Sequence, residues 1–214
     1  MKDLSEYRKS YEKSELLESS IPDNPFDLFN IWFQEVENSK TTEEANAMTI
    51  STVGLDGFPK SRVVLLKQYN PDGFTFYTNY ESEKGKAIAQ NPKVCLSFFW
   101  PSIERQVIIK GVAVKVSNKI SDDYFASRPK GSQFGAVVSN QSAVILSRNV
   151  LEQKLAVLQE QFANATITRP ENWGGYCVKP EAIEFWQGRP NRLHDRVSYQ
   201  LNDTNDWTIK RLSP

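Results

Sequence analysis

The stretch from Trp186 to Arg196 concentrates groups that bind anions. Its last eight residues hold three arginines and the only histidine of the chain: Arg189, Arg192, His194 and Arg196. Gly188 and Pro190 interrupt a strand ladder, so the apolar run 182–185 is expected to end in a loop here. A planar guanidinium binds phosphate through two hydrogen bonds. The stretch is therefore either a solvated charged loop or an anion-binding edge of a sheet.

Two more groups of cations and hydroxyls occur earlier in the chain. The first comprises Arg62, Lys67, Tyr77, Thr78, Ser82, Lys84 and Lys86. The second comprises Tyr124, Arg128, Lys130 and Ser132. A helix N-terminus with cations nearby suits a phosphate, and a helix is expected over 82–90. If the strand over 61–67 is regular, Arg62 and Lys67 point to opposite faces and serve two separate sites.

Few side chains remain that could act as a nucleophile or hold a metal. One histidine and no Cys-x-x-Cys predict no metal site. Cys95 and Cys177 are expected to be buried thiols in a reducing compartment, which favours the cytoplasm. Two anion sites with few candidate nucleophiles or metal ligands indicate a phosphorylated cofactor beside a phosphorylated substrate. The cofactor would then perform the chemistry itself.

Charge and hydropathy exclude other classes of protein. The 26 basic and 26 acidic residues leave no overall basicity for nucleic-acid binding. No apolar run approaches the length of a membrane span, and the first residues lack the apolar region of a signal peptide. We therefore expect neither a nucleic acid nor a membrane as partner. A chain of 214 residues fits one domain.

The elements that must position these residues follow from periodicity and turn signals. Residues 4–20 predict a marginal surface helix or a mobile arm. Asn24 and Pro25 predict the start of a helix whose core stripe includes Phe26, Phe29 and Phe33. Strands are predicted over 47–53, 61–67, 74–79, 93–100, 105–117, 176–178, 182–187, 196–201 and 207–211. Further helices are predicted over 82–90, 121–127, 131–139 and 149–164. Hairpin-linked strands with helices predict an α+β fold, mainly antiparallel, as a barrel or sandwich.

Several runs together resemble the pyridoxine (pyridoxamine) 5′-phosphate oxidases. The matching runs are Arg62-Val-Val-Leu-Leu-Lys67, Phe76-Tyr-Thr-Asn79, Glu104-Arg-Gln-Val107, Tyr124-Phe-Ala-Ser-Arg-Pro129, Gln141-Ser142, Trp173-Gly-Gly175, Phe185-Trp-Gln-Gly188 and Asn191-Arg-Leu-His-Asp-Arg196. The resemblance runs from residue 8 to residue 214. It implies an FMN-binding split barrel with flanking helices, here a single domain over 21–214 after an arm or lid over 1–20. It also implies a homodimer with FMN between the subunits.

The resemblance implies a reaction and a role for each matching residue. Pyridoxamine or pyridoxine 5′-phosphate would be oxidised to pyridoxal 5′-phosphate, with O2 as acceptor and hydrogen peroxide as product. The FMN site would take Arg62, Val63, Leu66, Lys67, Tyr77, Thr78, Lys84 and Gln106 from one subunit, and Gln141, Ser142, Trp186 and Arg196 from the other. The substrate would contact Arg8, Tyr11, Lys67, Tyr124, Arg128, Ser132, Arg192 and His194. Arg192 and His194 would lie at the reacting carbon, and we expect orientation to outweigh proton transfer for both.

One residue departs from the family pattern. Glu83 stands where the family usually has an arginine that helps to bind the FMN phosphate. A carboxylate repels a phosphate unless it points away. Arg62, Lys84 and Lys86 are the cations left to compensate. Glu83 keeps open a rival interpretation, a non-catalytic flavin- or pyridoxal-phosphate-binding protein on the same fold, and a further one, a split-barrel flavin oxidoreductase with another substrate.

Overall fold

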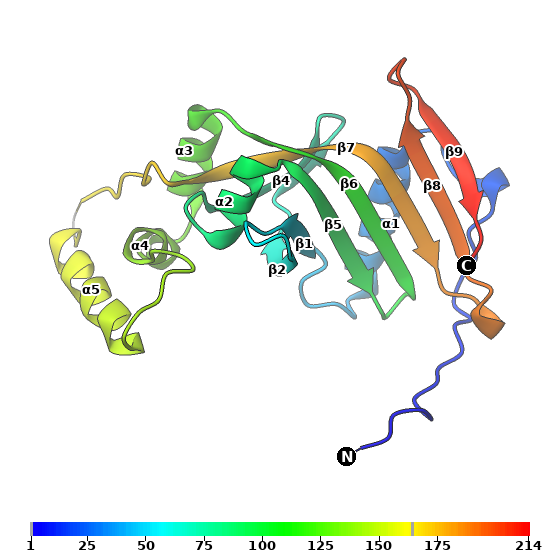
Figure 1. Cartoon of the computed structure of the whole chain (residues 1–214), viewed down its shortest axis with the longest axis horizontal. Helices are drawn as coiled ribbons and strands as arrows, with labels where there is room; N and C mark the ends of the chain where they lie inside the picture. The colour runs from blue at the N-terminus through cyan, green and yellow to red at the C-terminus, as the bar shows by residue number, and fades with distance from the viewer. Residues whose placement is uncertain (1, 164) are drawn as a thin grey trace. The chain divides into compact units, whose positions relative to one another are not determined.

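A computed structural model describes residues 2–163 and 165–214 (Figure 1). The chain divides into two compact units, each built from separate segments. Unit 1 comprises Met1–Thr49, Cys95–Gly111 and Pro180–Pro214, and unit 2 comprises Ile50–Val94 and Val112–Lys179. The single domain over 21–214 stays a prediction. Within the described residues, no helix has the length and apolar character needed to cross a membrane.

The strands form an antiparallel-rich sheet, which confirms the predicted α+β class. They are β1 (Ala47–Val53), β2 (Pro59–Leu65), β3 (Gln68–Asn70), β4 (Gly73–Asn79), β5 (Lys93–Trp100), β6 (Arg105–Lys115), β7 (Trp173–Gln187), β8 (Asp195–Leu201) and β9 (Trp207–Leu212). Their order is β2-β1-β5-β6-β7-β4-β3, with β8 paired to β7 and β9 paired to β8. The described pairs of β4 with β7 and of β7 with β8 are antiparallel.

Unit 1 is built around helix α1 (Pro25–Ser39). The side chain of Asn24 accepts the N–H of Phe26 and caps this helix, as predicted. The predicted apolar stripe is buried, and it meets rings from the sheet of the same unit. The ring centroid of Phe29 lies 5.3 Å from that of Phe98, and Trp32 lies 5.1 Å from Phe185. Burial of these aromatic rings stabilises unit 1.

The N-terminal segment is an arm without regular structure up to the short 3-10 helix η1 (Glu18–Ser20). A surface helix over 4–20 is therefore wrong for the described part of the arm. The arm is exposed for most of its length, but the side chain of Leu16 is buried. Alternating charges give this segment too little apolar surface to stabilise a helix by packing.

Unit 2 carries helices α2 (Glu83–Gln90), α3 (Asn118–Ser127), α4 (Lys130–Val138) and α5 (Arg148–Gln161). Ser82 caps α2 by accepting the N–H of Gly85. The core holds Phe125, Phe134, Ile167 and Trp173, and the apolar stripe of α5 packs against it half-buried. The predicted end of the last helix at residue 164 lies outside the described residues.

Two expectations about strands need correction. The strand over 61–67 ends at Leu65 and a new strand begins at Gln68, so the argument that Arg62 and Lys67 share one regular strand fails. The strands over 176–178 and 182–187 are one strand, β7. Pro180 lies between the residues of β7 that pair with β4 and those that pair with β8, so its missing N–H breaks neither ladder.

The two cysteines are half-buried rather than buried, and both are free. Cys95 lies on β5 and Cys177 on β7, in the strands predicted for them. Burial raises the pKa of both thiols, so neither is an activated thiolate.

Candidate functional site

Unit 2 contains a cavity of about 820 Å³ next to the N-terminus of α2. Its lining residues are Leu55, Asp56, Lys60, Arg62, Asn79, Glu81, Glu83, Lys86, Asn140, Gln141, Ser142, Ala143 and Asn172. The cations come from β2 and α2, and the loop after α4 supplies Asn140, Gln141 and Ser142. The cavity therefore brings together Arg62 and Lys86 of the first predicted anion-binding group and the predicted Gln141–Ser142 pair.

Lys84 places an amine beside neutral oxygen atoms. Its Nζ donates to Gln141 Oε1 at 2.9 Å and to Thr78 Oγ1 at 3.2 Å. Burial and the nearby Arg62 lower the pKa of Lys84, against the opposing effect of Glu83. Among the described residues no carboxylate pairs with this amine. A partly buried cation at a helix N-terminus without a counter-ion favours binding of an anion.

Gln141 lies beside implied FMN residues of its own chain, and the implied division of the FMN site between subunits stays a prediction. The resemblance implied that the partner subunit supplies Gln141 and Ser142. The structure places Gln141 against Thr78 and Lys84 of the same chain. Ser142 lines the same cavity, and its φ of 71° puts its backbone in the left-handed region. The loop after α4 thus lines the cavity of its own chain.

Glu83 does not point away from the cations of the cavity. Its Oε1 accepts Lys60 Nζ at 2.6 Å, and its Oε2 accepts Arg62 Nη2 at 3.1 Å. The hydrogen bond from Lys60 is the main cause that lowers the pKa of Glu83. The run 62–67 holds two further residues implied for the FMN site: Val63 is exposed and Leu66 is buried.

The second anion-binding group lies at the junction of α3 and α4. The guanidinium of Arg128 lies 4.6 Å from the ring centroid of Trp173. Its Nη1 is buried and has no hydrogen-bond partner among the described residues. Burial lowers the pKa of Arg128, against the opposing effect of Tyr124. A buried donor without a partner costs about 1–3 kcal/mol, so Arg128 is poised to bind an anion. Ser132 is exposed in the first turn of α4.

The two groups of unit 2 are joined by stacked rings. Tyr77, implied for FMN, stacks on Tyr124, implied for the substrate, with centroids 3.8 Å apart and planes 18° apart. Trp173 continues the stack at 5.6 Å from Tyr77. Lys67 lies on the link between β2 and β3 with an exposed side chain, and the structure records no contact between it and the described residues of either group.

Unit 1 carries a ring cluster around the histidine. The ring centroids of Trp186 and His194 lie 4.7 Å apart, and the ring centroid of Tyr11 in the arm lies 5.7 Å from each of them. The backbone N–H of Arg189 donates to Nδ1 of His194 at 3.0 Å. Burial and then Arg192 lower the pKa of His194, against Asp195. The imidazole is therefore neutral at pH 7, and the hydrogen bond assigns its proton to Nε2.

Arg192 is presented by a strained turn. Asn191 and Arg192 have φ values of 56° and 63°, a left-handed conformation that costs non-glycine residues energy. The side chain of Arg192 is exposed, and no hydrogen bond to a described residue is recorded for its guanidinium. A strained backbone that presents an exposed cationic side chain is typical of a functional site.

The other residues of unit 1 that the resemblance implied for the FMN and substrate sites have contacts outside the ring cluster. Arg196 donates two hydrogen bonds to the carboxylate of Glu184, at 2.8 and 3.2 Å, so its charge is already compensated. Gln106 lies on β6, and its amide is 3.5 Å from Ser97 Oγ. Arg8 is exposed on the arm, where its Nε donates to the carbonyl of Ser5. Of the two implied arm residues, the structure brings Tyr11 alone to the ring cluster.

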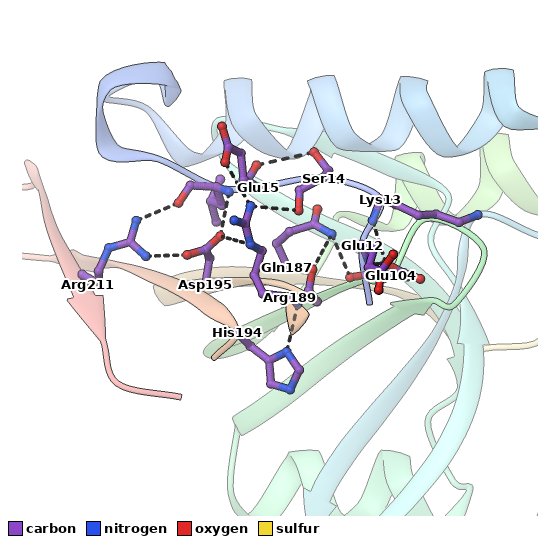
Figure 2. Close-up of polar contacts among 12 residues, drawn as sticks. Glu12, Lys13, Ser14, Glu15, Glu104, Gln187, Arg189, His194, Asp195 and Arg211 are labelled. Atoms are coloured by element: carbon purple, nitrogen blue, oxygen red, sulfur yellow. Dashed lines mark hydrogen bonds and ion pairs between the residues drawn. The ribbon is translucent and has the colours of Figure 1, made fainter. Parts of the chain in front are cut away.

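The arm is held on unit 1 by the buried carboxylate of Glu104 (Figure 2). Glu104 Oε2 accepts the backbone N–H of Glu12 at 2.8 Å and of Lys13 at 3.0 Å. Burial alone would raise the pKa of Glu104, but these N–H groups and the amine of Lys9 outweigh it, and the pKa is lowered. A φ of 59° at Glu104 again marks a strained position.

Asp195 provides a second anchor for the arm. Its Oδ2 accepts the N–H of Leu16 at 3.0 Å, and its Oδ1 accepts Arg211 at 2.8 Å (Figure 2). Arg189 adds a hydrogen bond to the carbonyl of Ser14 at 3.3 Å. These contacts fix the chain on the C-terminal side of Tyr11, which positions that ring beside the histidine.

We expect the arm to detach more often when Glu104 is replaced by glutamine. The change removes the charge from two hydrogen bonds and an ion pair, which should raise the detached fraction by about tenfold. Trypsin cleavage within residues 8–13 measures this, because proteolysis follows the population of the open state when closing is fast. Glu12→Gln is the matched control, since it keeps the backbone N–H that Glu104 binds. Equal cleavage of both variants would contradict the anchoring role.

Sequence reasoning missed three residues that the structure makes prominent. Glu104 and Asp195 lie inside matched runs, but their acceptance of backbone N–H groups from the arm depends on contacts far apart in sequence. Lys60 precedes the run 62–67 and carried no signal by itself. Its position two residues before Arg62 on one strand was the clue, because alternate residues of a strand share a face.

Comparison with known proteins identifies the family of the chain. Residues 35–162 match the family described as "Pyridoxamine 5'-phosphate oxidase", and residues 173–214 match the "Pyridoxine 5'-phosphate oxidase C-terminal dimerisation region". A protein of Flavobacterium psychrophilum named pyridoxine/pyridoxamine 5'-phosphate oxidase is 63% identical over 214 residues, covering 100% of both chains. A protein of the same name from Flavobacterium johnsoniae is 65% identical over 213 residues, covering 100% of both chains.

Solved structures show the same fold. PhzG from Burkholderia lata, crystallised with tetrahydrophenazine-1-carboxylic acid, superposes with a TM-score of 0.87 at 26% identity, covering 95% of this chain and 100% of its own. A pyridoxamine 5'-phosphate oxidase-related, FMN-binding protein from Nostoc punctiforme has a TM-score of 0.70 at 15% identity, covering 91% and 100%. The predicted split-barrel fold is thus confirmed. Because its full length aligns with relatives at 63% and 65% identity, this chain belongs to the pyridoxine/pyridoxamine 5'-phosphate oxidase family of oxidoreductases.

Proposed function

We propose that the chain catalyses the FMN-dependent oxidation of pyridoxamine or pyridoxine 5'-phosphate to pyridoxal 5'-phosphate in the cytoplasm. O2 is the acceptor, hydrogen peroxide is a product, and the amine substrate also releases ammonia. The observation that supports this most is the pair of anion-binding groups in unit 2, joined by the stack of Tyr77 on Tyr124. Two phosphate esters of flat ring systems, one of them the cofactor, suit such an arrangement.

The donors of the cavity fit the phosphate of FMN. Gln141 and Ser142 line the cavity, and the amine of Lys84, which has no counter-ion among the described residues, donates to Gln141 and to Thr78. Arg62 adds a guanidinium at the cavity wall. FMN, when bound, supplies the acceptor for the two electrons of the oxidation. The protein groups bind its phosphate and leave the flat ring free to meet a substrate.

The substrate phosphate is assigned to Arg128, Tyr124 and Ser132. The unpartnered Nη1 of Arg128 gains its missing hydrogen bond from a phosphate oxygen. Arg192 then orients the substrate, and His194 offers a hydrogen bond from its Nε2–H. A neutral imidazole whose Nδ1 already accepts a hydrogen bond is poorly placed to remove a proton through that nitrogen. Orientation is therefore the main contribution of both residues.

The test of this proposal is O2 consumption by the FMN-loaded protein with pyridoxamine 5'-phosphate, with pyridoxal 5'-phosphate quantified as the product. Turnover that requires both FMN and the phosphorylated substrate supports the oxidase. FMN binding without turnover would favour the non-catalytic flavin-binding protein. Turnover only with an unphosphorylated substrate would favour another split-barrel oxidoreductase.

We expect a homodimer with FMN at the subunit interface. The implied FMN residues fall in two different compact units, and residues 173–214 match a dimerisation region. Sedimentation at micromolar concentration should give twice the mass of the 24.5 kDa chain. A monomer that still binds flavin under these conditions would contradict the dimer.

A further inference from the structure

The charges lining the cavity of unit 2 are balanced within the protein. Lys60, Arg62 and Lys86 line it together with three carboxylates, those of Asp56, Glu81 and Glu83. A phosphate must therefore compete with internal anions for the lining cations. Lys60 and Arg62 can exchange their partner for a phosphate, because the carboxylate that they share, Glu83, is 37% exposed, and ion pairs at exposed positions contribute little.

Lys60 is the more enclosed of the two lysines of the lining. Its side chain is 29% exposed, against 54% for that of Lys86. Lys60 Nζ lies 2.6 Å from Glu83 Oε1 and 3.0 Å from Asp56 Oδ2. Lys86 Nζ reaches Glu81 at 3.9 Å, the outer limit of an ion pair. The amine of Lys60 is thus held at one place on the cavity wall, and that of Lys86 is not.

Gly54 leaves space for the side chain of Lys60. A Cβ at Gly54 would lie 2.9 Å from Cε of Lys60 and 2.6 Å from Oδ1 of Asp56. Real side chains do not approach so closely, so an alanine here would push both groups aside. Gly54, Asp56 and Glu83 together determine where the amine sits.

Glu83 links Lys60 to Arg62. Its two oxygen atoms take one cation each, so the amine and the guanidinium lie on either side of one carboxylate. A phosphate monoester presents several oxygen atoms and twice the charge, and it can bridge the same two donors. The carboxylate therefore occupies the place in the hydrogen-bond network that a ligand phosphate would take.

We propose that Lys60 is a phosphate-binding residue of this cavity, and that Glu83 is the internal anion that holds Lys60 and Arg62 until the phosphate of FMN replaces it. This inference rests on the proposed FMN site. It makes Lys60, rather than Lys86, the cation that compensates for the family arginine absent at position 83. It also explains how a carboxylate can stand at that position: Glu83 is neutralised by the two cations that it positions.

The test compares FMN with riboflavin, which has the same ring system and no phosphate. Ligand-free protein is titrated with each flavin, and quenching of flavin fluorescence gives the dissociation constant. Lys60→Met should weaken FMN binding by about tenfold, the effect of losing one charge-assisted hydrogen bond, and should leave riboflavin binding unchanged. Lys86→Met should change FMN binding by less than about twofold, as expected for an exposed cation. Lys60→Arg keeps the charge and should restore most of the FMN affinity.

Glu83→Gln tests the second half of the proposal. Removing the competing charge should strengthen FMN binding by about threefold, the scale of one exposed ion pair, again without effect on riboflavin. Weaker FMN binding by Glu83→Gln would overturn its role as a displaced anion.

The alternative is that the Lys60–Glu83 pair only ties β2 to α2. In that case Lys60→Met weakens both flavins equally or neither, and either result overturns the assignment of Lys60. A larger loss in Lys86→Met than in Lys60→Met overturns it as well. Wild-type protein that binds neither flavin would overturn the proposed function together with this inference. Wild-type protein that binds FMN beside an unaffected Lys60→Met overturns the inference alone.

Discussion

Replacement of Arg192 by alanine is expected to lower kcat/KM for pyridoxamine 5'-phosphate by about 100-fold or more, with FMN still bound. Losses of this size follow when a group that orients the substrate is removed. Arg192 is exposed, is held by a left-handed turn and is always charged, so it can bind and orient but cannot act as a base. Arg148→Ala, at an exposed position of α5, is the matched arginine control and should leave kcat/KM unchanged.

His194→Asn provides the decisive contrast. We expect a smaller loss than for Arg192→Ala, because the neutral imidazole offers one hydrogen bond and no charge. Anaerobic single-turnover reduction of the flavin isolates this step from the reaction with O2. If His194→Asn abolished reduction while Arg192→Ala barely slowed it, a histidine acting as general base would be the better account.

Arg128→Met is expected to raise KM for the phosphorylated substrate by about 10- to 100-fold, the value of one or more hydrogen bonds between charged groups. The ligand-free protein should lose little stability. The change removes a buried N–H without a partner, a gain of about 1–3 kcal/mol, and loses a contact with Trp173 worth roughly 0.5–2 kcal/mol. Steady-state kinetics and thermal unfolding of the same preparation separate the two effects.

A matched lysine variant sharpens this prediction. Arg128→Lys keeps the charge but cannot bind a phosphate through a planar pair of donors, so its KM should lie between those of wild type and Arg128→Met. If Arg128→Met instead lowered thermal stability strongly and left KM unchanged, Arg128 would be a structural residue of the Trp173 core and not a ligand group.

Sequence patterns were sufficient where neighbouring residues decide the structure. The start of α1 at Asn24 and Pro25 follows from local capping, and its buried stripe follows from helical spacing. The strand β1 and the short helix α2 follow equally from short-range signals. Cations and hydroxyl groups close together in sequence also pointed to the two anion-binding groups of unit 2, whose binding of phosphate stays a prediction.

Sequence patterns failed to predict contacts between residues that lie far apart in the sequence. Gln141 reaches Lys84 across 57 positions, and Lys60 reaches Glu83 across 23, so no local spacing reports either contact. Glu83 next to a phosphate site suggested repulsion, but its neutralisation by Lys60 is a property of the folded chain. The break between β2 and β3 was missed because the apolar run 63–66 continues across the end of the strand.

The central claim is that the bound flavin is reduced by a B6 phosphate oriented by this chain. The most direct measurement mixes FMN-loaded protein with pyridoxamine 5'-phosphate under anaerobic conditions and follows the visible absorbance of the flavin. We predict complete bleaching, with one pyridoxal 5'-phosphate formed for each flavin and recovery of the absorbance when air is admitted. A flavin that stays oxidised while both ligands are bound would contradict the account and favour a binding protein without catalysis.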